Sequence, residues 1–371
     1  MNRKKFLGLA GSSIVLAGTT YYMLSDKSNF VRADISEEET FKVSLTKDER
    51  RILYLASLAP SGHNTQPWFI RHIEPLHWIV CNDKSRWLAA VDPTQRETIL
   101  SIGAFIQNVE YAASSLGYNC EFNTLARTNQ DEQVVSVKFI KSASLFKFDS
   151  ESIIQRRTVR SNILSLKLET KDIRLLINNE PDLVHFIPLK TKSYDYLNEQ
   201  TVEANRAQSY RDQAQRELAN WIRFSSKDAE KHRDDLSTAS MEIEGFSGWV
   251  VRNFYRKSNV MNNSFREQSI LQVEKQVASS AGWFIIVSKD SSLDSLLATG
   301  MRMQRLFLKV KEKGIAIHPM TQILEEPFTD KRLNSSIGIK EPVQFILRSG
   351  YVKDYPKPVS LRRPITQLIK S

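Results

Sequence analysis

Apolar and polar positions along this chain follow patterns that predict both helices and strands. Residues 46–59 place Ile52, Leu55 and Ala59 on one face of a helix, and Thr46 with Glu49 forms a capping box at its start. Pro60 ends that helix. A second helical pattern predicts a helix at about residues 97–116. Apolar, strand-like runs predict strands at residues 68–73, 77–81, 282–288 and 342–352.

Two helical segments far apart in the chain share one pattern. Both "GAFIQNVEYAASSLG" (residues 103–117) and "GMRMQRLFLKVKEKG" (residues 300–314) begin and end with glycine and carry glutamine at the same place. Their apolar positions also match, so we interpret the pair as a diverged internal duplication. A duplicated unit in one chain can imitate a homodimer, and a site between the copies then draws residues from both.

A long charged helical segment, about residues 192–277, separates elements of the second part of the chain. Two interpretations stay open for it. It forms either ordinary solvated helices or a cover over a pocket, because large insertions between core elements often serve as lids.

The N-terminus has the layout of a targeting segment. Basic residues Arg3, Lys4 and Lys5 precede residues 6–24, which carry no charge. This predicts a secretory signal or an uncleaved membrane anchor at residues 1–25, followed by a polar linker at residues 26–45. The basic head should stay inside, which places the rest outside the cytoplasm, either periplasmic or membrane-anchored and facing outward. A buried N-terminal helix is the alternative.

The export route has its own sequence mark. The stretch "RKKFL" resembles a twin-arginine export signal, with Lys4 where the second arginine usually stands.

Composition narrows the classes of function. With 41% hydrophobic and 25% charged residues the chain is globular, and its net charge of +10 favours an anionic partner. No helix-turn-helix, RNA-binding or zinc pattern supports nucleic-acid binding. The two cysteines, Cys81 and Cys120, show no pairing pattern, and the six histidines show no metal-ligand spacing, so we expect no metal.

The stretch "SLAPSGHNTQPWFI", residues 57–70, is dense in turn formers and amide side chains. A helix end, a proline and then Ser61-Gly62 leave backbone N–H groups exposed in a tight bend. Asn64 and Gln66 both donate and accept hydrogen bonds, which suits the edge of a heteroaromatic ring or a polyol. The residues alone leave two alternatives, a cofactor loop or a hydrogen-bonded turn without a ligand.

The segment "APSGHNTQPW" (residues 59–68) resembles the cofactor loop of the nitroreductase family, whose members are flavin mononucleotide (FMN) oxidoreductases. The segments "QRRTVRSN" (residues 155–162), "GIAIHPMTQ" (residues 314–322) and "GYVKDYPKPVSLRRP" (residues 350–364) continue the resemblance. Their order is similar to the Acg-type branch, in which two nitroreductase-like halves are fused in one chain.

This resemblance implies the fold and the domain organisation. We expect an α+β fold, with a nitroreductase-like mixed sheet flanked by helices that occurs twice in the chain as a pseudo-dimer and carries the helical insertion. The first half should span residues 46–145 and the second residues 146–371. A monomer with this internal pseudo-dimer is the expected state.

The resemblance also implies the site, with FMN between the halves. Arginine forks suit a phosphate dianion because each donates two hydrogen bonds to it. The cofactor-binding residues it implies are those of the loop, of an arginine group near the phosphate, of a segment along the ring and of the tail: Pro60, Ser61, Gly62, Asn64 and Gln66; Arg156, Arg157 and Arg160; Pro319, Met320 and Thr321; Arg362 and Arg363.

The implied reaction passes electrons from a reduced nicotinamide, NAD(P)H, through FMN to a nitroaromatic, a quinone or a similar small acceptor. It requires no protein acid or base, and we assign no catalytic residue. The alternative is a flavin-binding or sequestering protein with a closed lid and little reductase activity. A hydrolase built on Ser61 and His63 is disfavoured because the chain has no G-x-S-x-G serine elbow.

Overall fold

The computed structural model describes residues 25–26, 45–142, 148–177, 180–326 and 332–370. The predicted signal or anchor (residues 1–25) and the linker (residues 26–45) lie outside this part except at their ends. Among the described residues no helix is both long and apolar enough to cross a bilayer.

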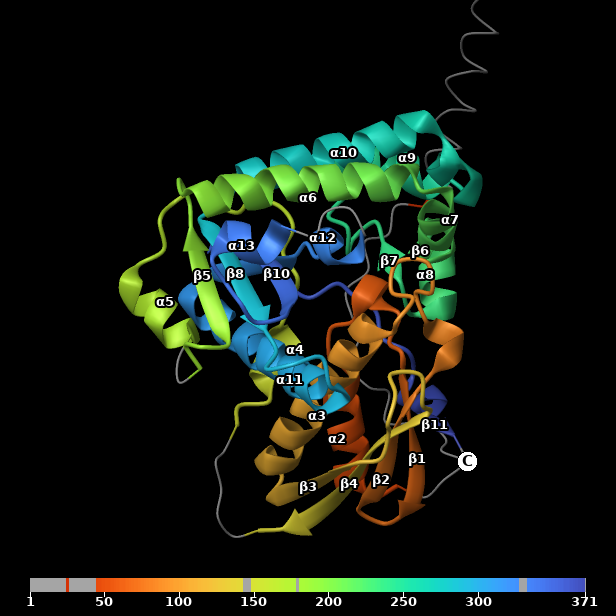
Figure 1. Ribbon diagram of the computed structural model, residues 1–371. Helices are drawn as coiled ribbons and strands as arrows, with labels where there is room; N and C mark the ends of the chain where they lie inside the picture. The colour runs from red at the N-terminus through yellow and green to blue at the C-terminus, as the bar shows by residue number, and fades with distance from the viewer. Residues whose placement is uncertain (1–24, 27–44, 143–147, 178–179, 327–331, 371) are drawn as a thin grey trace, which may run out of the picture.

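The described residues form two main sheets, each flanked by helices, as an α+β fold requires, and a two-stranded sheet of β6 and β7 in the insertion (Figure 1). The first sheet has the strand order β11-β1-β2-β4-β3 and is mixed, since β11 pairs parallel with β1 while the other pairs are antiparallel. Its strands are β1 (Trp68–Glu74), β2 (His77–Asn82), β3 (Tyr118–Thr124), β4 (Gln133–Lys141) and β11 (Ile369–Lys370).

The second sheet has the order β5-β8-β10-β9, and all its pairs are antiparallel. Its central strand β8 is buried at every position, which agrees with the uninterrupted apolar run that predicts it. The strands are β5 (Val184–Pro188), β8 (Gly282–Val287), β9 (Ile315–Pro319) and β10 (Val343–Tyr351).

Helices α2 and α3 begin and end close to the residues that the pattern predicts, whereas α11 begins seven residues before the segment 300–314. In α2 the capping box is present, because the Thr46 hydroxyl accepts from the Glu49 N–H at 3.1 Å and the Glu49 carboxylate accepts from the Thr46 N–H at 2.9 Å. The helices are α2 (Lys47–Ser57), α3 (Arg96–Ser115), α4 (Glu151–Gln155), α5 (Thr170–Ile177), α11 (Leu293–Val310), α12 (Gln322–Glu325) and α13 (Leu333–Ile337), with the short 3₁₀ turns η1 (Gly62–Asn64), η2 (Lys84–Arg86), η4 (Lys311–Lys313) and η6 (Ile365–Leu368).

The duplicated segments lie in α3 and α11, which cross at the centre of the molecule (Figure 1). A Cβ atom built on Gly103 would lie 3.0 Å from the Cα of Gly300, and one built on Gly300 would lie 3.0 Å from the Cα of Gly103. Beyond the crossing, Gln304 donates to the Asn108 side chain at 2.7 Å and Arg305 donates to the Gln107 side chain at 2.8 Å. Matching positions of the two copies therefore meet, as expected of a pseudo-dimer.

The insertion forms a helical layer above the second sheet and reaches the first half (Figure 1). Its longest helices, α6 and α10, pack against each other. Its elements are α6 (Lys192–Tyr210), α7 (Asp212–Asn220), β6 (Ile222–Arg223), α8 (Ser226–His232), β7 (Leu236–Ser237), α9 (Gly245–Phe254), η3 (Lys257–Met261) and α10 (Asn263–Ala278).

The chain ends join other parts of the molecule. The tail runs back to the first half, where Ile369 and Lys370 stand in register with Ile70 and Arg71. At the other end, Ser25 accepts from the Trp249 indole N–H at 2.8 Å. Both cysteines carry free thiols.

Candidate functional site

The loop (residues 57–70) is held in a strained conformation. His63, Asn64 and Gln66 have φ values of 46°, 56° and 53°, the left-handed region that costs a residue with a Cβ about 1 kcal/mol. Their neighbours must compensate for this cost. Ser61 contributes by accepting the Gln66 N–H at 3.0 Å, and Pro60 precedes it at the half-buried mouth of the loop.

The amide side chains of the loop bind protein atoms from two distant segments. The Asn64 amide donates to the carbonyls of Asp235 at 3.2 Å and Leu361 at 3.1 Å. The Gln66 amide donates to the Arg233 carbonyl at 3.1 Å and accepts from the Arg363 N–H at 2.9 Å. The groups that sequence reasoning assigned to a cofactor thus join the loop, the tail and the insertion.

The backbone carbonyls of the loop are bound by three arginines, Arg156, Arg362 and Arg363. Arg362 donates to the carbonyls of Ser57, Leu58 and Ala59 and to the Asn64 side chain, the last at 2.7 Å. These carbonyls stand at the C-terminal end of α2, where a cation is favourable. Arg156 donates to the Leu58 carbonyl as well, at 3.1 Å. The Leu58 carbonyl therefore brings the tail and the start of the second half together.

Arg363 is aimed at the far end of the loop. Its guanidinium donates to the carbonyls of Gln66 at 2.8 Å and Trp68 at 2.7 Å. Burial, followed by the nearby positive charge of Arg86, lowers the pKa of Arg363 to about 9. A guanidinium so placed stabilises the extended segment that leads into β1.

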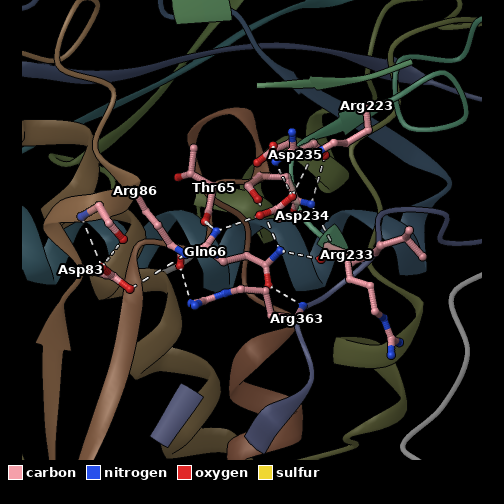
Figure 2. A network of polar contacts seen from close by, with 12 residues as sticks. Thr65, Gln66, Asp83, Arg86, Arg223, Arg233, Asp234, Asp235 and Arg363 are labelled. Carbon is pink, nitrogen blue, oxygen red and sulfur yellow. Dashed lines mark hydrogen bonds and ion pairs between the residues drawn. The ribbon is translucent and has the colours of Figure 1, made fainter. Parts of the chain in front are cut away.

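An inner segment of the insertion, residues 233–244, lies on the loop (Figure 2). Arg86 donates both to the Thr65 carbonyl at 2.9 Å and to the Asp234 carboxylate at 3.0 Å. Arg223 pairs with Asp234 and with Asp235. Burial and the adjacent Asp234 charge raise the pKa of Asp235 to about 8. The first half and the insertion are thus joined by buried ion pairs.

Arg157 and Arg160 meet a carboxylate of the same inner segment. The Glu242 carboxylate accepts from the Arg157 guanidinium at 3.0 Å, from the Arg160 N–H at 3.1 Å and from the Ser161 N–H at 2.7 Å, and also from the Ser161 hydroxyl. We call this donor set, from Arg157, Arg160 and Ser161, the anion cradle. Burial lowers the pKa of the Arg160 guanidinium.

The predicted ring segment, Pro319 to Thr321, follows β9. Met320 is packed in the core of the second half, whereas the Thr321 hydroxyl lies 3.2 Å from a Glu97 oxygen and 3.0 Å from a Glu325 oxygen. Burial and the Glu325 charge raise the pKa of Glu97 to about 8, so this carboxyl pair keeps a proton at neutral pH. A Cβ on Gly62 would lie 3.4 Å from the other Glu97 oxygen, which places the loop beside this segment.

Two histidines face Arg160 from opposite halves. His63 belongs to the loop and His318 to β9, and the Nδ1 atom of each is buried without a hydrogen-bond partner among the described residues. Burial and the Arg160 charge lower the pKa of His63 to about 4. For His318, burial and the charges of Arg348 and Arg160 lower the pKa well below its usual value. Both rings are therefore neutral, polar and close to one guanidinium.

The predicted residues therefore gather at the junction of the halves, but in separate groups. Asn64, Gln66, Arg362 and Arg363 bind one another directly, and Arg156 joins them through the Leu58 carbonyl. Arg157 and Arg160 turn to Glu242. Sequence reasoning missed Glu97, Glu242 and Glu325, because nothing in their local sequence shows that they approach the loop.

Neither of the two best-formed cavities among the described residues has the size of a flavin site. The larger, about 260 Å³, is lined by Lys289, Asp294 and Arg302 beside α11, and the smaller is lined by Arg223 and by Ser237 and Thr238 of the inner segment. Cofactor pockets commonly measure about 300–1,000 Å³. The donors at the junction therefore suit a polar anionic cofactor, but a ligand the size of a flavin enters only if the inner segment moves. Within the described ranges, no group of three or more His, Cys, Asp or Glu side chains could hold a metal ion.

Comparison with known proteins gives relatives of which several are named nitroreductases. No family model matches the chain. The putative NAD(P)H nitroreductase acg of Mycobacterium tuberculosis is 23% identical over 85% of this chain and 92% of its own length. The probable NAD(P)H nitroreductase PigM of a Serratia strain is 20% identical over 84% of this chain and 89% of its own length. These matches confirm the resemblance to Acg-type nitroreductases over most of the chain.

Solved structures include nitroreductases too, at low similarity. A putative nitroreductase from Anabaena variabilis is 12% identical, with a TM-score of 0.36 over 89% of this chain and 94% of that one. The FMN and NADPH-dependent nitroreductase NfnB from a Sphingopyxis strain is 12% identical, with a TM-score of 0.37 over 60% of this chain and 97% of that one.

Proposed function

We propose that this chain, similar over most of its length to Acg-type nitroreductases, is an oxidoreductase that binds FMN. In this proposal a reduced nicotinamide is the electron donor, and a nitroaromatic, a quinone or a similar small molecule is the acceptor. The support is the length of the similarity and the position of the site between two duplicated halves. The position of the cofactor is inferred from the geometry of the junction.

The observation that carries the proposal is the pair of unpartnered ring nitrogens at the junction. His63 Nδ1 and His318 Nδ1 are buried, come from different halves and face the charge of Arg160. A buried polar atom without a partner costs free energy. Such atoms also occur away from the junction, as at His185 Nε2, but this pair lies beside the loop and the Arg160 charge. A cofactor with a phosphate, a polyol chain and a polar ring edge offers partners to such atoms.

The residues of this chain have distinct roles in the proposal. The anion cradle would hold the phosphate, the loop would meet the polar edge of the ring, and the segment from Pro319 to Thr321 would run along it. Bound FMN supplies the hydride-accepting and electron-donating chemistry. The Glu97 and Glu325 carboxyls hold a proton beside the Thr321 hydroxyl.

A second function is favoured by the position of the inner segment. Because residues 233–244 are bonded to the loop and to the anion cradle, an acceptor has no open path to the junction. A protein that takes up FMN and then closes would hold the flavin rather than turn it over. This flavin-holding protein is the alternative to the reductase.

Visible absorbance of the purified full-length chain separates these alternatives. We expect a yellow protein, or one that becomes yellow with added FMN, with absorbance near that of bound flavin. A chain that stays colourless and takes up no FMN contradicts both functions. Anaerobic addition of NADPH, then of NADH, should bleach the reductase, whereas flavin colour that persists identifies the flavin-holding protein.

We also propose that the chain is exported, on the basis of the basic head and the uncharged residues 6–24. Full-length chain and a form lacking residues 1–24 can each be fused to alkaline phosphatase, which is active only outside the cytoplasm. We expect activity from the first fusion alone. Equal activity of the two fusions contradicts export by this segment.

A further inference from the structure

Glu242 approaches the anion cradle from a loop of the insertion that is tightly folded around it. The residue has φ = 59°, a left-handed conformation that a residue with a Cβ rarely adopts. Around it, the Ile243 N–H donates to the Thr238 carbonyl at 2.9 Å, and Arg160 donates to the Ser240 carbonyl at 2.7 Å. A strained backbone held by its surroundings is common where a side chain has a task.

The donors that receive Glu242 are those that a phosphate would use. Two successive backbone N–H groups, from Arg160 and Ser161, a hydroxyl and a guanidinium converge on one carboxylate. Such convergent N–H groups with a charged fork are a frequent form of phosphate site. The Arg157 guanidinium also donates to the Lys357 carbonyl at 2.7 Å, but the donors that converge at the centre of the cradle are taken by Glu242. A carboxylate and a phosphate therefore cannot occupy the cradle together.

The carboxylate also belongs to the segment that closes the junction. Residues 233–235 of that inner segment are bonded to the loop through Gln66 and Arg86 (Figure 2). Asn64 adds a hydrogen bond to the Asp235 carbonyl. Glu242 fixes the other end of the same segment on the second half. Release of the cradle by Glu242 would therefore free the part of the insertion that fills the space between the halves.

We infer that Glu242 competes with the cofactor phosphate for the anion cradle. Phosphate can bind there only after Glu242 leaves, and the departure of Glu242 releases that end of the inner segment. This inference rests on the proposed function, because it concerns the regulation of the same site. The cradle accepts either the carboxylate of its own chain or the phosphate of a ligand. The apparent affinity for the ligand is then the intrinsic affinity multiplied by the fraction of molecules whose cradle is open.

Glu242→Gln tests the competition directly. The amide keeps the length of the side chain but removes the charge that makes these hydrogen bonds strong. We expect the dissociation constants of inorganic phosphate and of FMN, measured by isothermal titration calorimetry on the full chain, to fall by about tenfold, the change expected for loss of one such contact. The matched control is Glu244→Gln, which removes one charge from an exposed position of the same segment.

A second measurement keeps the test valid if Glu242→Gln lowers stability. Phosphate should raise the melting temperature of the variant more than that of the wild type. The uncharged amide competes less strongly for the cradle, so phosphate binds the folded variant more tightly. Glu242→Asp keeps the charge but shortens the side chain by one methylene, and its affinity for phosphate should lie between those of the wild type and Glu242→Gln. Equal phosphate affinity and equal melting shifts in wild type, Glu242→Gln and Glu244→Gln overturn the inference.

The two probes distinguish this inference from the proposed function. If Glu242→Gln gains affinity for inorganic phosphate while no form binds FMN, the competition is real and the flavin proposal fails. If every form binds FMN with one affinity, the flavin proposal stands and Glu242 is no competitor.

Discussion

Arg362 directs all three nitrogens of its guanidinium to protein oxygens of the loop and the tail. The resemblance implies that this residue contacts the cofactor, which stays a prediction. The structure buries Arg362 and places its guanidinium at the end of α2. A sequence shows that a cation is present, but the partner of a long side chain depends on which carbonyls the fold leaves open nearby.

Glu97 is the residue whose charge state is most open to measurement. Its pKa, raised from 4.5 to about 8 by burial and by Glu325, lies above the value in the unfolded chain. The stability that this carboxyl contributes is therefore complete below pH 4.5 and is lost as the pH rises through about 8. The slope is at most about 1.4 kcal/mol per pH unit for one proton.

Glu97→Gln should flatten this dependence. We expect the unfolding free energy of the wild type, measured by urea titration, to fall relative to that of the variant between pH 5 and 8. Asp235 also has a raised pKa, of about 8, and should change both proteins equally, whereas the pKa of Asp92, raised to about 6 by burial and then by the Glu97 charge, should fall in the variant and flatten its curve further. Glu121→Gln, at an exposed strand position, should leave the wild-type curve in place. Parallel curves for wild type and Glu97→Gln would contradict the shared proton.

The contact between the insertion and the loop is an element-scale feature that depends on ion pairs. Asp234 pairs with Arg86 at 3.0 Å and with Arg223 at 2.9 Å, and it is almost fully buried. Removing one partner of a buried pair leaves an uncompensated charge and costs about 3–5 kcal/mol. Because the contact joins two elements, we expect the cost to appear as local opening of the insertion.

Asp234→Asn should therefore make residues 222–244 more sensitive to protease. We expect cleavage in this range to become at least about tenfold faster, measured by gel and mass spectrometry under native conditions. Asp228→Asn removes a charge from the exposed helix α8, where the carboxylate pairs only with exposed His232 at 3.4 Å, and should leave the rate unchanged. If both variants are cut at the wild-type rate, the ion pairs do not hold the insertion closed.

Local signals predicted the elements well and their distant contacts poorly. The helix expected at residues 46–59 is α2, and the strand expected at residues 282–288 is β8, because a capping box and an apolar run are local features. The two-residue strand β11 has no pattern of its own, since it exists only where the tail meets β1. Glu242 likewise has no distinguishing neighbours in the sequence, and only the fold brings it to Arg157.

The site followed the same division. The loop and the arginine segment stood out by their density of amide, glycine and guanidinium groups, and they do meet at one junction. Their hydrogen-bond partners could not be predicted, because those are mostly backbone carbonyls, which every residue carries. Residues 233 and 235 of the insertion are hydrogen-bonded to the loop, and the role of residues 192–277 as a cover stays a prediction.

At the scale of the whole molecule, the two halves are joined by the crossing of α3 and α11. The closeness of the two helices requires glycine at both crossing positions. A Cβ on Gly300 would lie 2.0 Å from the Leu100 carbonyl oxygen, and one on Gly103 would lie 2.3 Å from the Leu297 carbonyl oxygen. Leu100 and Leu297 precede their own glycines by the same interval, so the contact repeats about an internal two-fold axis.

Gly300→Ala tests whether this crossing holds the halves together. In an exposed helix the change would stabilise the protein by about 1 kcal/mol, because alanine is the better helix former. Here the added methyl would force backbones apart, and overpacking of this kind costs about 1–3 kcal/mol. We therefore expect a net loss of unfolding free energy, measured by urea titration. Ala298→Gly, at an exposed position of α11, is the control, because it measures the difference in helix propensity between alanine and glycine without any overpacking. A Gly300→Ala protein as stable as the wild type would mean that the helices separate without cost, and the site between the halves would then lack a rigid frame.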